Sequence, residues 1–137
     1  MYVLSMSLKN LIPKHKDDTE TAEKLFEYSY EEVRSIIPEL LAWIQDMNWP
    51  VSRPMADYLV SMSEYLTKDL MKILNGNDEV WKYWCIDVFG LYSDKPLDPT
   101  IVAKIKSIAE NPTESEIAEE VVEQALRYLK KIAHNTK

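Results

Sequence analysis

The stretch IIPELLAWIQDMNWPVSRPMADYLVSM, residues 36–62, holds the pattern that decides the fold. Each of six apolar positions in it is matched, 29 residues further along the chain, by another apolar residue. The pairs are Leu41 and Leu70, Ile44 and Ile73, Val51 and Val80, Ala56 and Cys85, Leu59 and Val88, and Val60 and Phe89. A fixed period of this length is typical of helical hairpins that stack on one another. The sequence therefore predicts an all-α fold, an α-α superhelix of about three helical hairpins.

Signals for helix starts divide the chain into its expected helices. Ser29 with Glu32, and Thr113 with Glu116, form capping boxes of the type S/T-x-x-E. Apolar residues at spacings of three and four follow each box, as expected for the buried stripe of a helix. The expected helices cover about 18–28, 29–45, 52–65, 67–75, 78–90, 99–110 and 113 to the C-terminus.

Prolines and a glycine add detail to these helices. Pro99 suits the first position of the sixth helix, where an amide hydrogen is not needed. Pro38 falls inside the second helix and cannot donate a backbone hydrogen bond, so we expect a kink near Arg34. Ser52 is the expected N-cap of the third helix. Gly76 is the expected left-handed residue after the fourth.

Length and composition favour one helical domain. The chain has 137 residues, of which 46% are hydrophobic and only two are glycine. A single domain of this length buries roughly 68% of the surface that its unfolded chain exposes. We therefore expect one domain over residues 1–137, in which residues 1–16 form an N-terminal arm and connector. Alternating apolar residues in this arm are compatible with a strand, but an extended segment lying on the first helices is favoured.

Cysteine content and charge bear on the compartment and on the partners. Cys85 is the lone cysteine, and the first residues lack the pattern of a signal peptide, so we expect a cytoplasmic protein. No apolar run is long enough to span a membrane. The formal net charge of −7 opposes binding to nucleic acid and suits a basic protein partner. Ordinary solubility accounts for the same charge at least as well.

The sequence offers no catalytic or metal-binding pattern. His15 and His134 lie near opposite ends of the chain, and neither has a neighbouring cysteine or an HExxH arrangement. Cys85 falls on the expected buried side of its helix, where a thiol packs like a small apolar group. Two glycines are too few for a phosphate-binding loop. We therefore expect no catalytic residue, no metal and no cofactor.

The most informative candidates form a binding face on the second helix of each hairpin. In stacked helical repeats this face binds partners, and Trp, Tyr and Arg dominate such interfaces. The candidate binding residues are Trp49, Arg53, Tyr58, Trp81, Lys82, Tyr83 and Asp87. The 29-residue offset stacks Arg53 over Lys82 and Tyr58 over Asp87, whereas Trp84 is assigned to the core. Packing in the core and at its boundary is the alternative role for these aromatic residues.

Two resemblances support a helical fold. HEAT repeats often read I-x-P-x-L-L-x-x-L in the first helix, followed by Asp and Val at the turn, and the chain resembles this pattern twice. The matching residues are Ile36, Pro38, Leu40, Leu41, Ile44, Asp46 and Val51, then Leu70, Ile73, Leu74, Asp78 and Val80. LIPKHKDD, IIPELLAWIQDMNWPV and DEVWKYW, between Leu11 and Trp84, are similar to a bacterial family classed as a domain of unknown function. That resemblance implies a small all-helical domain and carries no activity.

Two classes of function follow as hypotheses. The first is a non-enzymatic protein-binding module of a bacterial cytoplasmic protein; an immunity-type protein that neutralises a basic toxin would be one such role. The alternative is an enzyme on a helical-repeat scaffold, either DNA glycosylase-like or lyase-like. A glycosylase needs a basic groove, which a net charge of −7 opposes. A lyase needs a nucleophile and a pocket with convergent polar groups.

Overall fold

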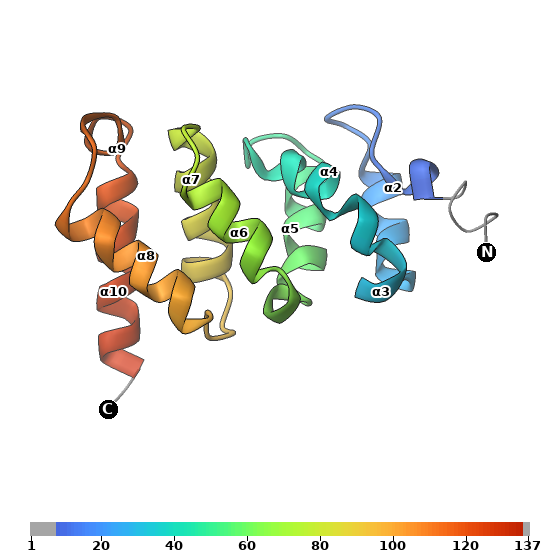
Figure 1. The fold of residues 1–137 in the computed structure, drawn as a ribbon. Coiled ribbons are helices and arrows are strands. Elements are labelled where there is room, and N and C mark those ends of the chain that lie inside the picture. The colour runs from blue at the N-terminus through green and yellow to red at the C-terminus, as the bar shows by residue number, and fades with distance from the viewer. Residues whose placement is uncertain (1–7, 136–137) are drawn as a thin grey trace. The chain divides into compact units, whose positions relative to one another are not determined.

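The chain is all-α (Figure 1). The computed structural model describes residues 8–135, and within them every regular element is a helix, which confirms the predicted fold class. The helices group into two compact units that divide between Met62 and Ser63. No helix within residues 8–135 is long and apolar enough to cross a membrane. Residues 1–7 of the expected N-terminal arm lie outside the described residues, and the single domain over 1–137 stays a prediction.

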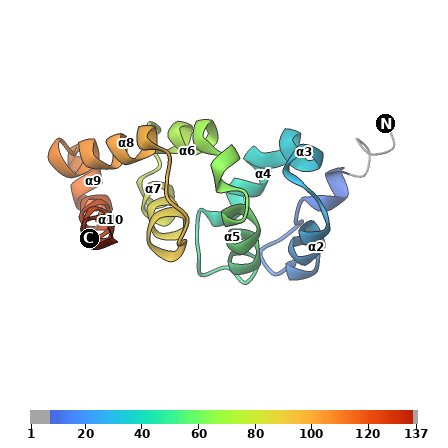
Figure 2. The same ribbon diagram turned by 90° about the horizontal axis from the view of Figure 1, so that it is seen from below.

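Short helices pack around α5 in the first unit. Its elements are η1 (Lys9–Leu11), α2 (Thr19–Lys24), η2 (Leu25–Glu27), α3 (Tyr30–Val33), η3 (Arg34–Ile36), α4 (Ile37–Leu41), η4 (Ala42–Ile44) and α5 (Ser52–Val60), where each η is a 3-10 helix. α5 packs against α2 and η4, and Figure 2 shows α2 beside α5. Fully buried side chains at the centre of the unit include Leu25, Leu40, Ile44, Met55 and Leu59.

Local signals in the first unit are mostly confirmed. Ser29 and Glu32 form the predicted capping box. The predicted kink appears as the 3-10 turn η3, after which α4 restarts with Pro38 in its first turn. Ser52 is not the predicted N-cap, because Val51 holds that position. The buried Ser52 hydroxyl instead lies 2.7 Å from the carbonyl oxygens of Trp43 and Asp46, to either of which it can donate its one proton.

The second unit contains the two longest helices of residues 8–135, α8 and α10. Its elements are η5 (Ser63–Tyr65), α6 (Thr67–Leu74), α7 (Glu79–Cys85), the π-helix η6 (Ile86–Tyr92), α8 (Pro99–Glu110), α9 (Glu114–Ala118) and α10 (Val121–Asn135). α10 packs against α8, α7 and η6, and α6 packs against α7 and α8. Asp78 and Asp98 cap α7 and α8, and the predicted capping box of Thr113 and Glu116 opens α9.

Three helix ends in the second unit differ from the prediction. Gly76 is not left-handed, because α6 closes through Asn75 and Gly76 amides that donate to preceding carbonyls in ordinary geometry. The helix expected to stop at Gly90 continues as η6 to Tyr92. The last helix is interrupted at Glu120, whose φ of 64° separates α9 from α10.

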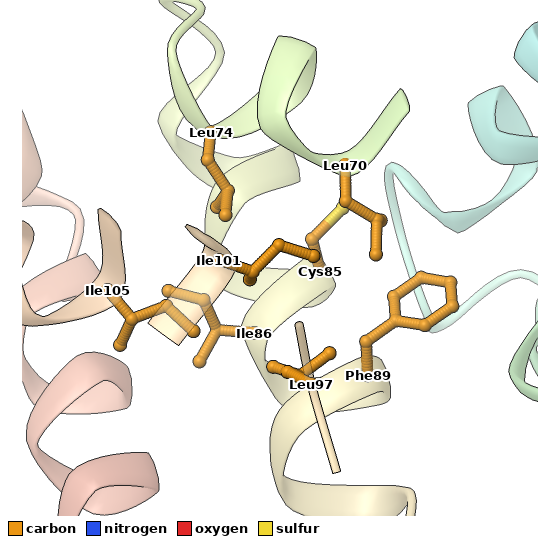
Figure 3. Close-up of a pocket in the computed structure, with 8 residues that line it drawn as sticks. All are labelled: Leu70, Leu74, Cys85, Ile86, Phe89, Leu97, Ile101 and Ile105. Atoms are coloured by element: carbon orange, nitrogen blue, oxygen red, sulfur yellow. The ribbon is translucent and has the colours of Figure 1, made fainter. Parts of the chain in front are cut away.

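Eight apolar side chains converge in the core of the second unit (Figure 3). They are Leu70, Leu74, Cys85, Ile86, Phe89, Leu97, Ile101 and Ile105, and they surround a cavity of about 10 Å³. A space this small with an apolar lining does not hold water or a ligand. The predicted burial of Cys85 is confirmed, and its burial raises the pKa of the thiol. A neutral, enclosed thiol packs as an apolar group.

The 29-residue pattern identifies the core well, with one clear failure. Ten of its twelve positions are buried, and Val60 is half-buried. Val80 is 46% exposed, because the side of α7 that faces the core carries Lys82 and Cys85 instead. Outside this pattern, the apolar residues Phe26, Ile117 and Leu126 are exposed.

Gly90 is the position where a small residue is required for packing. A Cβ added to Gly90 would lie 2.9 Å from Cδ1 of the Tyr128 ring, which is only 3% exposed. Helix propensity favours alanine by about 1 kcal/mol, but overpacking a filled core costs about 1 to 3 kcal/mol. We expect Gly90→Ala to lower the free energy of unfolding by up to about 2 kcal/mol in urea denaturation. Gly76→Ala is the matched control and should cost less; a more stable Gly90→Ala chain would contradict the packing argument.

Candidate functional site

A buried ion cluster lies between α7 and α9. Lys82 Nζ is 2.7 Å from Glu79 Oε1 and 3.0 Å from Glu116 Oε2. Lys82 is 4% exposed, so its assignment to an exposed binding face is wrong. The physical reason is charge compensation: two carboxylates surround the ammonium, and burial of a lysine is tolerated only when it is paired in this way.

Local structure fixes both carboxylates. Glu79 lies one turn before Lys82 on α7, and Ser115 Oγ donates a hydrogen bond to its Oε2. Glu116 is the third residue of α9, and its Oε1 accepts a hydrogen bond from the Thr113 amide at 2.9 Å. One capping-box residue thus both caps α9 and pairs with the buried lysine. The spacing of Glu79 and Lys82 was a signal for half of this cluster, whereas nothing in the sequence linked Glu116 to it.

The cluster keeps its members charged. Burial by itself lowers the pKa of Lys82, but its hydrogen bonds with Glu79 and Glu116 outweigh burial and raise the pKa above 10.5. Burial likewise raises the pKa of Glu116, but the Thr113 amide and Lys82 outweigh it and hold the pKa below 4.5. A lysine that holds its proton this firmly is poorly suited to act as a nucleophile.

Two hollows adjoin the cluster. A cavity of about 230 Å³ has Lys82 and Glu116 in its lining, together with the polar residues Asn75, Asn77, Glu79, Lys104, Ser107, Asn111, Thr113 and Ser115. A wide groove of about 700 Å³ is lined by Asn77, Asp78, Glu79, Val80, Ser115 and Glu119. The two hollows share Asn77, Glu79 and Ser115, so they meet at the first turns of α7 and α9.

The outer face of α7 consists of Val80, Tyr83, Trp84 and Asp87, the last of which begins the next turn in η6. Val80 is exposed and the other three are partly exposed, so the core assignment of Trp84 is wrong. The rings of Tyr83 and Trp84 meet edge to face with centroids 5.0 Å apart. Gln124 of α10 donates to Asp87 Oδ1 at 3.3 Å. Neighbouring contacts therefore hold this face in place while leaving it open to solvent.

Of the three candidate binding residues in the first unit, one is buried and two are accessible to solvent. Tyr58 is 2% exposed, and its hydroxyl donates to the Tyr28 carbonyl at 2.8 Å. Its place on an exposed binding face is wrong, because the ring fills the core and only the hydroxyl needs a polar partner. Burial, with a smaller effect from Glu32, raises the pKa of Tyr58 to about 12. Arg53 is exposed and Trp49 is partly exposed.

The remaining aromatic candidate is Trp81. It is partly exposed, but its Nε1 is buried and finds no hydrogen-bond acceptor within residues 8–135. An unpaired buried N–H costs about 1 to 3 kcal/mol. Over the same residues no three His, Cys, Asp or Glu side chains are arranged to hold a metal ion.

These features define a small all-α domain with a buried ion cluster, an adjoining groove and a partly exposed aromatic face. The sequence matches the DUF5071 domain of unknown function over residues 11–129, and the chain belongs to that family. The similarity to a domain of unknown function that the motifs predicted is thereby confirmed. No curated protein matches the sequence.

Glu116 gives the cluster a pH dependence that can be measured. Its folded pKa is lowered, so its charge contributes stability that is present above pH 4.5 and is lost as the pH falls through the folded pKa. Glu116→Gln keeps an acceptor for the Thr113 amide but removes the charge opposite Lys82. We expect the variant to be less stable than the parent at neutral pH, and this difference to shrink below pH 4.5 in urea denaturation. A difference that stays constant with pH would contradict the assignment.

Proposed function

We propose that the chain is a non-enzymatic protein-binding module. The observation that carries the proposal is the outer face of α7, where Tyr83 and Trp84 are in edge-to-face contact and partly exposed beside an exposed Val80. Aromatic residues held in this way are the type that contributes most to protein interfaces. They also bury much apolar area while losing little conformational freedom on binding.

A HEAT-like repeat organisation and a bacterial cytoplasmic setting belong to this proposal. The repeat is supported by the 29-residue period, because ten of its twelve positions are buried. The setting rests on the motifs and on the cysteine content of the sequence alone. An immunity-type role, in which the chain neutralises a basic toxin, would suit the net charge of −7.

The enzyme alternative has one feature in its favour, the polar cavity of about 230 Å³ beside Lys82. The Lys82 amine would have to lose a proton to act as a nucleophile or base. Glu79 and Glu116 oppose that loss, since they raise the pKa of Lys82. Cys85 faces the apolar core instead of this cavity. The binding module is therefore the better supported of the two functions.

Site-specific photo-crosslinking tests the proposal. A photoreactive phenylalanine in place of Tyr83 should yield one discrete protein adduct in cells of the source organism, whereas the same group in place of the exposed Phe26 should not. The identified protein, once purified, should bind Tyr83→Ala about fivefold more weakly than the parent. The denaturation midpoint of Tyr83→Ala should change little, since its side chain is partly exposed. Equal affinity for parent and variant, or no adduct at position 83, would refute the proposal.

A further inference from the structure

We infer that the groove between the first turns of α7 and α9 binds a segment of a protein partner that carries lysine or arginine. The inference rests on the proposed binding function and specifies the chemistry of the partner. The groove measures about 700 Å³ and is lined by Asn77, Asp78, Glu79, Val80, Ser115 and Glu119. Val80 belongs both to this groove and to the outer face of α7, so the two surfaces are continuous.

The charge of the groove selects a cation. None of its six lining residues is basic, and Asp78 and Glu119 are exposed. Glu79 is paired with Lys82, but that lysine is shared with Glu116, so these three residues carry a net charge of −1. The nearby Lys104 acts on Glu116 and lines the adjoining cavity, but it is not part of the groove lining. Positive ends of the helix dipoles of α7 and α9 are already occupied by Asp78 and by the capping box. The field at the groove is therefore negative and attracts positively charged groups.

The apolar part of the groove selects an amphipathic side chain. Val80 is 46% exposed and lies beside the carboxylates in the same groove. Lysine and arginine carry aliphatic stems that cover apolar surface while the charged end remains near carboxylates. Further along α7, the rings of Tyr83 and Trp84 offer faces that attract cations. A metal ion would make no favourable contact with the exposed Val80 side chain. A second copy of this acidic chain would be repelled by the like charge.

Peptide titration followed by amide NMR tests the inference directly. The probe is a short amphipathic peptide of lysine and leucine, and its counterpart has glutamate in place of lysine. We expect the lysine peptide to shift the amide signals of Asn77, Asp78, Val80, Ser115 and Glu119, and the glutamate peptide to leave them unchanged. Signals that shift elsewhere, or equally with both peptides, would overturn the inference. So would groove signals that change with protein concentration alone, since a second copy would then be the occupant.

Matched variants separate a built site from general attraction to an acidic protein. Glu119→Lys should weaken binding of the lysine peptide about fivefold or more, whereas Glu39→Lys, which makes the same charge change at an exposed position of α4, should alter affinity less than about twofold. Val80→Ser should also weaken binding, whereas Leu126→Ser, at an exposed leucine of α10, should not. Equal losses for the members of either pair would overturn the inference.

The photo-crosslinking partner distinguishes this inference from the proposed function. If the purified partner depends on Tyr83 but binds Glu119→Lys as tightly as the parent, the groove assignment fails and the binding function stands. If no protein crosslinks at position 83 and the lysine peptide binds nowhere, both fail. Loss of partner binding with both Tyr83→Ala and Glu119→Lys, but not with Glu39→Lys, supports both.

Discussion

Replacing Lys82 by methionine should lower the free energy of unfolding by about 3 to 5 kcal/mol, because removal of one partner from a buried ion pair leaves the opposite charge uncompensated. Methionine retains most of the volume of the lysine stem, so the loss reports charge and hydrogen bonding more than packing. In this chain two carboxylates, Glu79 and Glu116, would lose the ammonium at once. Urea denaturation followed by circular dichroism gives the measurement.

Two controls make the Lys82 result specific. Lys72→Met changes an exposed lysine on α6 and should cost less than about 0.5 kcal/mol. Combining Lys82→Met with Glu79→Gln and Glu116→Gln removes every charge of the cluster and should recover a large part of the lost stability. If Lys82→Met and Lys72→Met were equally mild, the ammonium would not be buried between the carboxylates in solution.

Helix positions were largely predictable because their signals are local. The capping boxes of Ser29 and Thr113 each require residues within one turn, and both helices begin where those boxes stand. Pro38 breaks its helix for an equally local reason, the missing amide hydrogen. In contrast, Gly76 was assigned a left-handed conformation that the chain uses at Glu120, because tertiary packing and not residue type alone decides which residue takes it.

The candidate site was harder to predict because it depends on a distant pairing. Hydropathy placed Val80 and Trp84 in the core and Lys82 in solvent, but the buried side of α7 carries Lys82 and Cys85. That arrangement is stable only because Glu116, 34 residues later, provides a second carboxylate. Periodicity records which residues avoid water on average and cannot show that a particular charge will be compensated. Tyr83 is partly exposed as expected, because the accessibility of its position does not depend on such a partner, and its role in binding stays a prediction.

Truncation of Leu41 to alanine should lower the free energy of unfolding by about 2 to 5 kcal/mol, the range for buried leucines. Leu41 is 1% exposed in α4 and belongs to the 29-residue pattern that predicted the fold. The same chemical change at Leu126, which is 53% exposed on α10, should cost less than about 0.5 kcal/mol. Leucine and alanine both favour helix, so the comparison isolates loss of buried contacts and the cavity left behind. Chemical denaturation of the two variants decides it: a Leu41→Ala loss as small as that of Leu126→Ala would show that residue 41 is not packed in the core.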